Sequence, residues 1–449
     1  MKYLLPLILA LLASTPQIPG KTARVVVSDN RIVVCRAELE KPVLPAGESI
    51  RTVVKITLDA ARVPTDKKRP PINLAVVLDR SGSMSGSKIE HAKKAAIAAL
   101  RRLDEGDIFS LIAYNNGVET VIPAQAADDA DGMERRIRKI SSGGGTNLFG
   151  GVNQGASELR KHLSDRRYTP RIILLSDGLA NVGPSSPDEL GRLGAALVKE
   201  GISVTTVGVG NDYNEDLMTQ LSQKSDGNTY FVENSNDLPR IFAAELGDVL
   251  NVVARKVTIE IDCPAGIRPI RIIGRDGRLR GQRAEIFMNQ LYGGQSKYVL
   301  LEVEVPATAA EQTRQLASAR CVYRNALSDL AAESRSSVSA RFSGSKRAVI
   351  DNVNLDVQTE LGANYNAMLV NEVVDLADKG KTKEAVVQLR KRSAQLSQQA
   401  LLYNNGLLEA QSIDLKKRAA KLEKEGMGRS MRKLFRADSY QTTNQQEIR

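Results

Sequence analysis

Residues 72–83 read INLAVVLDRSGS, an unbroken apolar run that ends in an aspartate and a serine-rich turn. A continuous apolar run of this length is typical of a strand buried on both faces, as in a parallel sheet covered by helices. Apolar residues then recur at helical spacing over 89–100, and Ser87 with Glu90 has the pattern of a capping box. A buried strand, a polar turn and a helix in this order favour an α/β fold.

The same alternation of strands and helices continues to about residue 250. Strands are expected at 108–113, 118–122, 171–175, 202–207 and 228–232. Helices are expected between them, at 132–140, 148–163, 189–199, 213–223 and 238–249. Alternation of this kind predicts a doubly wound, mostly parallel, Rossmann-like sheet over residues 70–252, with helices on both faces.

On both sides of this predicted domain, the hydrophobic pattern changes to a period of two. Apolar and polar residues alternate at 53–58 before the domain and, after it, at 257–263, 299–305 and 338–342. Alternation is typical of antiparallel strands with one wet face. We therefore expect one antiparallel β-sandwich, formed by residues 24–68 and 255–345, into which the α/β domain is inserted.

The beginning of the chain has the pattern of a secretory signal peptide. Lys2 precedes an apolar run at 4–13, and small or turn-prone residues follow it. We interpret residues 1–20 as a signal peptide with cleavage near Ala13 or just beyond. A membrane-spanning helix needs about 20 apolar residues, and no later run is that long. The mature protein is thus expected without a transmembrane segment, in the periplasm, on the cell surface or outside the cell.

The end of the chain is helical and basic. We expect a helical region at 354–430 and a disordered tail at 431–449, because the last residues are polar. The net charge of the whole chain is +11. A basic excess can bind nucleic acid, but no nucleic-acid module or stacking-aromatic pattern accompanies it. We interpret these charges as solvated helix faces and expect no nucleic-acid partner.

Three cysteines, Cys35, Cys263 and Cys321, all fall in the predicted sandwich. An odd number leaves at least one thiol unpaired within a monomer, and the sequence leaves open whether any disulfide forms. No Cys-x-x-Cys pair or Cys/His cluster is present in the sequence, which argues against a zinc site.

Three predicted loops carry a set of oxygen ligands. Asp79, Ser81 and Ser83 follow the first buried strand, Asp177 follows a later strand, and Thr146 ends a glycine-rich loop before a helix. In open α/β sheets, ligands bind beyond the carboxyl ends of the strands. Two carboxylates and three hydroxyls suit Mg²⁺, with Mn²⁺ or Ca²⁺ as alternatives, better than zinc. Neutral hydroxyl ligands leave a cation short of negative charge, so a carboxylate from a partner would complete the site.

In their order and placement, these five residues resemble the metal-ion-dependent adhesion site of the von Willebrand factor type A family. The resemblance implies that Ser81 and Ser83 ligate the metal directly and Thr146 directly or through water. It implies that Asp79 and Asp177 act mainly through water. The similarity covers about residues 24–344. It is closest to the bacterial branch labelled calcium-activated chloride channel-like and to inter-alpha-trypsin inhibitor heavy chains, which also place strands on both sides of the metal domain.

No catalytic constellation accompanies this set. The only histidines, His91 and His162, do not form a His-Glu-x-x-His motif, and the serines have no base nearby in the sequence. We therefore expect no enzyme, but an exported protein-binding module for adhesion or assembly, whose cation holds an acidic group of a partner protein. The alternative is a structural or assembly subunit of an envelope complex whose metal only stabilises the fold. The sequence leaves the partner and the oligomeric state open.

Overall fold

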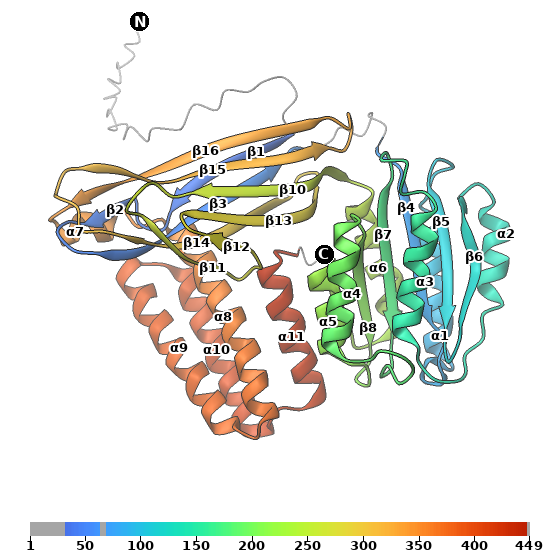
Figure 1. The fold of residues 1–449 in the computed structure, drawn as a ribbon. Coiled ribbons are helices and arrows are strands. Elements are labelled where there is room, and N and C mark those ends of the chain that lie inside the picture. The colour runs from blue at the N-terminus through green and yellow to red at the C-terminus, as the bar shows by residue number, and fades with distance from the viewer. Residues whose placement is uncertain (1–31, 63–68, 447–449) are drawn as a thin grey trace, which may run out of the picture.

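The computed structural model describes residues 32–62 and 69–446. The expected signal peptide and residues 24–31 of the first sandwich segment lie outside these residues. An α/β domain, a β-sandwich and a helical region make up the described part of the chain (Figure 1). Helix α11 (Arg429–Thr443) lies beside α5 (Glu215–Lys224), so that the helical region contacts the α/β domain.

The sheet of the α/β domain confirms the doubly wound prediction. Its strand order is β6-β5-β4-β7-β8-β9, and every pair is parallel except β5 with β6. The strands are β4 (Ile72–Asp79), β5 (Ile108–Tyr114), β6 (Val118–Ala126), β7 (Thr169–Ser176), β8 (Ser203–Val209) and β9 (Thr229–Val232). The full burial of β4 explains its unbroken apolar run.

Helices cover both faces of this sheet and form a separate apolar core on each (Figure 1). One face is covered by α1 (Ser87–Leu100), α2 (Ala130–Arg138) and α6 (Leu238–Val249). The other face is covered by α3 (Leu148–Arg160), α4 (Pro187–Lys199) and α5.

Helix α1 begins differently from the expectation. The serine-rich turn forms a short 3-10 helix, η1 (Gly82–Met84), and the N-cap of α1 is Gly86 with a φ of 73°. Glycine takes this left-handed conformation without steric cost. Ser87 is therefore already inside the helix and makes no side-chain cap, so the capping box expected at Ser87 and Glu90 is wrong.

The segments before and after the α/β domain form one sandwich, as predicted. Strand β3 (Ile50–Ala60) comes from before the insertion and pairs with β14 (Ser296–Val305) from after it, with Ile56 opposite Val299. The first sheet is completed by β1 (Val33–Leu39) and β11 (Arg268–Ile273). The second sheet contains β12 (Arg278–Arg280), β13 (Arg283–Tyr292), β10 (Val252–Asp262), β15 (Thr313–Asn325), β16 (Ala331–Ser343) and β2 (Val43–Pro45).

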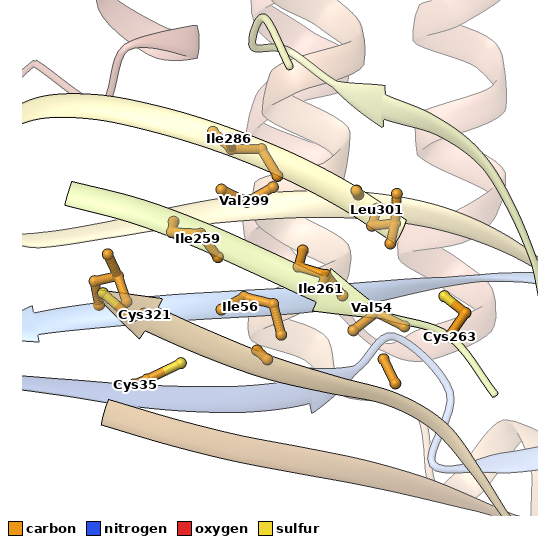
Figure 2. Packing of buried hydrophobic residues seen from close by; sticks show 14 of the residues in the cluster. Cys35, Val54, Ile56, Ile259, Ile261, Cys263, Ile286, Val299, Leu301 and Cys321 are labelled. Carbon is orange, nitrogen blue, oxygen red and sulfur yellow. The ribbon is translucent and has the colours of Figure 1, made fainter. Parts of the chain in front are cut away.

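The inward residues of both sheets pack into a single core, in which Ile56 and Ile259 come from opposite sheets (Figure 2). The three cysteines lie buried in this core and are free. Burial raises the pKa of the Cys35 thiol to about 12 and that of the Cys263 thiol to about 11. Protonated, buried thiols of this kind are poor nucleophiles and poor metal ligands.

A buried charge pair of the α/β domain lies next to the sandwich, and its arginine bonds to the sandwich strand β13. Arg171 on β7 lies 3.7 Å from Glu245 on α6, and both side chains are fully buried. Arg171 also donates to Gln290 Oε1 at 2.8 Å and to the Tyr292 hydroxyl, both on β13. Glu245 accepts hydrogen bonds from Thr205 (2.5 Å), Asn228 (2.8 Å) and Tyr230 (3.1 Å). Glu245 is thus well hydrogen-bonded, whereas Arg171 Nε is buried without a hydrogen-bond partner among the described residues.

The helical region runs further than expected. It consists of α7 (Lys346–Asp351), α8 (Leu355–Asp378), α9 (Thr382–Tyr403), α10 (Gly406–Glu425) and α11. The expectation of a disordered tail at 431–449 is wrong for residues 431–446, which form most of α11 and the turn after it; residues 447–449 lie outside the described part. In the described ranges, no helix is both long and apolar enough to cross a membrane.

Helix α11 is ordered because its polar side chains match polar groups of the α/β domain. Lys433 is buried, pairs with Glu215 at the start of α5 and donates to the Tyr213 carbonyl at 2.6 Å. Arg432 pairs with Glu215 and Asp216, and the Tyr440 hydroxyl donates to a backbone carbonyl at 2.6 Å. Its basic residues are therefore not only solvated faces. A polar composition cannot reveal such partners, which lie about 220 residues away in the chain.

Candidate functional site

The fold brings the five residues of the expected metal site to one edge of the α/β sheet. Asp79 is the last residue of β4, and Asp177 directly follows β7, the neighbouring parallel strand. Ser81 and Ser83 lie in the turn after β4, and Thr146 precedes α3. Four of these side chains are buried and only Ser83 is exposed. The set therefore lies just beneath the surface, at the carboxyl ends of the strands.

The two carboxylates are linked through the serines. Ser83 Oγ donates to Asp177 Oδ1 at 2.6 Å and lies 3.0 Å from Ser81 Oγ. The Ser81 backbone N–H donates to Asp79 Oδ1 at 2.8 Å, and Ser176 Oγ donates to Asp79 Oδ2 at 2.7 Å. Each carboxylate thus has a fixed orientation.

Three hydroxyls face one small volume beside Gly178. A β-carbon at this glycine would lie 3.0 Å from Ser83 Oγ, 3.4 Å from Thr146 Oγ1 and 3.8 Å from Ser81 Oγ. The absence of a side chain on Gly178 therefore leaves room for a ligand within reach of all three oxygens. Loops separated by more than 60 residues of sequence supply these oxygens.

Backbone hydrogen bonds hold the glycine-rich loop against the first turn. Gly82 N–H donates to the Gly144 carbonyl at 2.9 Å, and Gly143 N–H donates to the Arg80 carbonyl at 2.8 Å. Gly144 has a φ of 85°, and an added β-carbon would lie 2.3 Å from the Asn116 side chain. The positive φ favours glycine here, and a larger residue would also force the Asn116 side chain to move.

Two further residues, neither predicted from the sequence, complete the site. Asn181 Oδ1 accepts from the Thr146 backbone N–H at 2.8 Å and so positions the threonine. Lys88, in the first turn of α1, places its Nζ 2.5 Å from Asp177 Oδ2. The only sequence signal for either residue is nearness to the motif, because Asn181 follows Asp177 by four positions and Lys88 follows Ser83 by five.

The electrostatics of the two carboxylates differ. Burial raises the pKa of Asp79, although hydrogen bonds from Ser176 and Ser81 oppose the shift, and the nearby charge of Asp177 adds to it. Asp177 is compensated by the Lys88 ammonium group. Within the described residues, no cationic side chain pairs with Asp79, so an added positive charge near the hydroxyls would favour its ionised form.

Comparison with known proteins identifies the α/β part of the chain. The family model of the von Willebrand factor type A domain matches residues 73–244. The α/β part of the chain is thus a von Willebrand factor type A domain. Domains of this family commonly mediate protein–protein interaction, and the relatives of the chain are mostly non-enzymatic interaction modules.

Similarity to curated proteins covers about two fifths of this chain. An uncharacterised protein of Synechocystis is 31% identical over 183 residues, covering 41% of this chain and 43% of the relative. The rat inter-alpha-trypsin inhibitor heavy chain H3 is 28% identical over 200 residues, covering 42% of this chain and 22% of the relative. The chain thus spans less than half the length of these curated relatives.

Two solved structures share nearly the whole fold. A von Willebrand factor type A protein from Catenulispora acidiphila has a TM-score of 0.68 at 17% identity and covers 89% of this chain and 92% of its own. An ArnB paralog from Sulfolobus acidocaldarius has a TM-score of 0.62 at 19% identity and covers 92% of this chain and 98% of its own. The arrangement of all three parts therefore recurs in other proteins.

Proposed function

We propose that this protein binds a partner protein through a divalent cation, Mg²⁺ or alternatively Mn²⁺ or Ca²⁺, held by Asp79, Ser81, Ser83, Thr146 and Asp177. The observation that carries the proposal is the open volume beside Gly178, which three hydroxyl oxygens face at 3.0–3.8 Å from the position of an added β-carbon. The described residues contain no group of three or more His, Cys, Asp or Glu side chains arranged for a metal. Hydroxyls with two carboxylates form a hard-oxygen set, which suits these cations.

When bound, the cation supplies a positive charge that attracts a carboxylate of the partner. Ser81, Ser83 and Thr146 offer neutral oxygens, so they leave that charge largely uncompensated. Asp177 is hydrogen-bonded by Ser83 and paired with Lys88, and Asp79 is oriented by Ser81 and Ser176. This arrangement favours an acidic group as the completing ligand.

Lys88 favours a binding role for the cation over a purely structural one. Its ammonium group already compensates Asp177 inside the folded protein. The apolar cores on both faces of the sheet are complete without the site. The fold is therefore expected to persist when the cation is removed.

Capture of partners from an extract of the producing organism tests this proposal. The immobilised protein should retain a partner in Mg²⁺ and release it when a chelator is added. Ser83→Ala removes a hydroxyl that faces the open volume, and it should abolish capture. Ser85→Ala is the matched control. Ser85 lies two residues after Ser83, but its hydroxyl donates to the Gly82 carbonyl and should be dispensable for capture. Equal capture in chelator and in Mg²⁺ would contradict the proposal.

We further propose that the protein is exported through residues 1–20 and acts in the periplasm, on the cell surface or outside the cell. The apolar run behind Lys2 supports this. Amino-terminal sequencing of native protein should give a mature chain that begins after Ala13. An intact Met1 on native protein in the cytosol would exclude export.

A further inference from the structure

We propose that a second site, between the α/β domain and the sandwich, binds a small tetrahedral oxyanion such as phosphate or sulfate. A cavity of about 190 Å³ lies there, at the amino-terminal ends of β7 and β8. This is the sheet edge opposite to the one that carries Asp79. The loops α3–β7 and α4–β8 form one wall of the cavity, and β10, β13 and β15 of the sandwich form the other.

Positive charge gathers around this cavity. Arg255 and Arg324 both line it and share one carboxylate, Asp329, at 3.3 Å and 2.9 Å. Burial, together with the charge of Arg324, lowers the pKa of Arg255 against the opposing effect of Asp329. Lys256 and Arg166 also line the cavity, and neither side chain pairs with any carboxylate of the described ranges. The cations are therefore under-compensated by the protein itself.

The acceptors of the cavity, in contrast, are already occupied. Its two carboxylates pair with arginines outside the lining, Asp165 with Arg167 at 2.6 Å and Glu200 with Arg160 at 2.8 Å. The backbone carbonyls of residues 166–168 accept hydrogen bonds from Arg255 Nη1 at 2.6–3.3 Å. A ligand in this cavity thus meets free donors and few free acceptors, which selects an anion.

Gln290 supplies a neutral donor at the back of the cavity. The residue is 5% exposed, and its Oε1 accepts from Arg171 Nη2 at 2.8 Å. This bond fixes the amide, and Nε2 makes no hydrogen bond within the described part of the chain. Arg255, which lines the same cavity, has a buried Nε without a hydrogen-bond partner in the described ranges. A buried donor without a partner is costly, and an anion in the cavity would accept from these donors.

The backbone at Lys256 has an unusual conformation. Its φ is 51°, which costs free energy for a residue with a side chain. The register between β10 and β15 shifts at this point, between Arg255 and Thr258. Bulges of this kind re-aim side chains and are frequent beside functional sites. In a regular strand, neighbouring side chains point to opposite faces. At this bulge, the neighbours Arg255 and Lys256 both line the cavity.

The size of the cavity limits the ligand. Pockets for drug-sized molecules are usually about 300–1,000 Å³, so this one suits a single oxyanion and its waters. The anion is either a free ion or the terminal phosphate of a larger molecule whose remainder points to solvent. Both sources share the same chemistry at the cavity.

Isothermal titration calorimetry tests the site with inorganic phosphate, sulfate and glycerol 3-phosphate, in chloride buffer at constant ionic strength and without divalent cations. Saturable binding of the inorganic ions at millimolar concentration is expected if the ligand is a free ion. Binding of glycerol 3-phosphate alone would assign the site to the terminal phosphate of a larger molecule. No saturable binding of any of the three would overturn the proposal.

Two variants locate the binding. Gln290→Glu keeps an acceptor for Arg171 and replaces the free donor by a charged oxygen, so it should abolish binding while the fold persists. Lys256→Gln should weaken binding by about tenfold or more, as for the loss of a charge-assisted hydrogen bond. Arg341→Gln is the control, because this exposed cation lies on β16, away from the cavity, and should change nothing. Equal affinity in Gln290→Glu and wild type would contradict the assignment.

Discussion

Glu245→Ala is expected to lower the free energy of unfolding by about 3–5 kcal/mol, because it leaves the fully buried Arg171 without its counter-charge. The substitution also removes the acceptor for three side chains from β8, β9 and the turn between α5 and β9. Urea denaturation monitored by circular dichroism measures the loss. The effect should include loosening of the sandwich, since Arg171 also bonds to β13.

Two further variants separate this cause from general damage to α6. The double variant Arg171→Met with Glu245→Leu removes both charges and should recover much of the loss, since a buried pair is often no better than apolar residues of similar volume. Glu304→Ala breaks an exposed pair with Arg268 and should leave the unfolding midpoint nearly unchanged. A Glu245→Ala protein as stable as wild type would show that Arg171 does not need its counter-charge.

Asp79→Asn is expected to weaken binding of Mg²⁺ by about 10–100-fold or more, by analogy with the loss of groups that support metal ligands, and to abolish capture of the partner. The fold should survive. Burial raises the pKa of Asp79, so the folded protein without a cation already disfavours its charge, and a neutral side chain of the same shape is tolerated. Calorimetry measures the affinity, and a thermal melt measures the stability.

The same variant distinguishes a binding role of the cation from a structural one. If the cation served only to stabilise the fold, Asp79→Asn would melt at a clearly lower temperature, while its folded fraction would still capture the partner. The scale is set by linkage: a metal at 100 times its dissociation constant stabilises a protein by about 2.7 kcal/mol. Thr146→Val removes one hydroxyl without a change of charge or shape, and it should give the same loss of capture.

Much of the fold can be predicted from hydrophobic periodicity. The unbroken apolar run of β4 indicates burial on both faces, which is confirmed. The alternating patterns of β3 and β14 indicate antiparallel strands, which is confirmed by their pairing. The wet face expected for β3 is wrong, because residues 52–58 are all buried and Val53 packs against Val357 of α8. The split sandwich follows because equal patterns flank the inserted domain. Periodicity says nothing about a glycine N-cap, and the capping-box pattern placed the N-cap of α1 at Ser87 instead of Gly86.

The errors and omissions concern contacts between distant segments. Polar residues of α11 have their partners in another domain, namely Glu215, Asp216 and backbone carbonyls. The sequence shows only that these residues are polar, and this led to the wrong prediction of a disordered tail. Lys88 and Asn181 likewise act on Asp177 and Thr146 across loops. The gathering of the five candidate residues could be predicted, because their positions near strand and helix ends place them at one edge of a parallel sheet.

Calorimetric titration of Mg²⁺ and Mn²⁺ into the wild-type protein, with and without a glutamate-containing peptide, tests whether the protein holds a cation together with an acidic group. Each cation should bind at one site, and the peptide should raise the affinity for the cation. By reciprocity, the cation should raise the affinity for the peptide by the same factor. In Asp79→Asn, the affinity for the cation should fall by about 10–100-fold or more. Absence of cation binding to wild type, with the peptide as well as without it, would contradict the account.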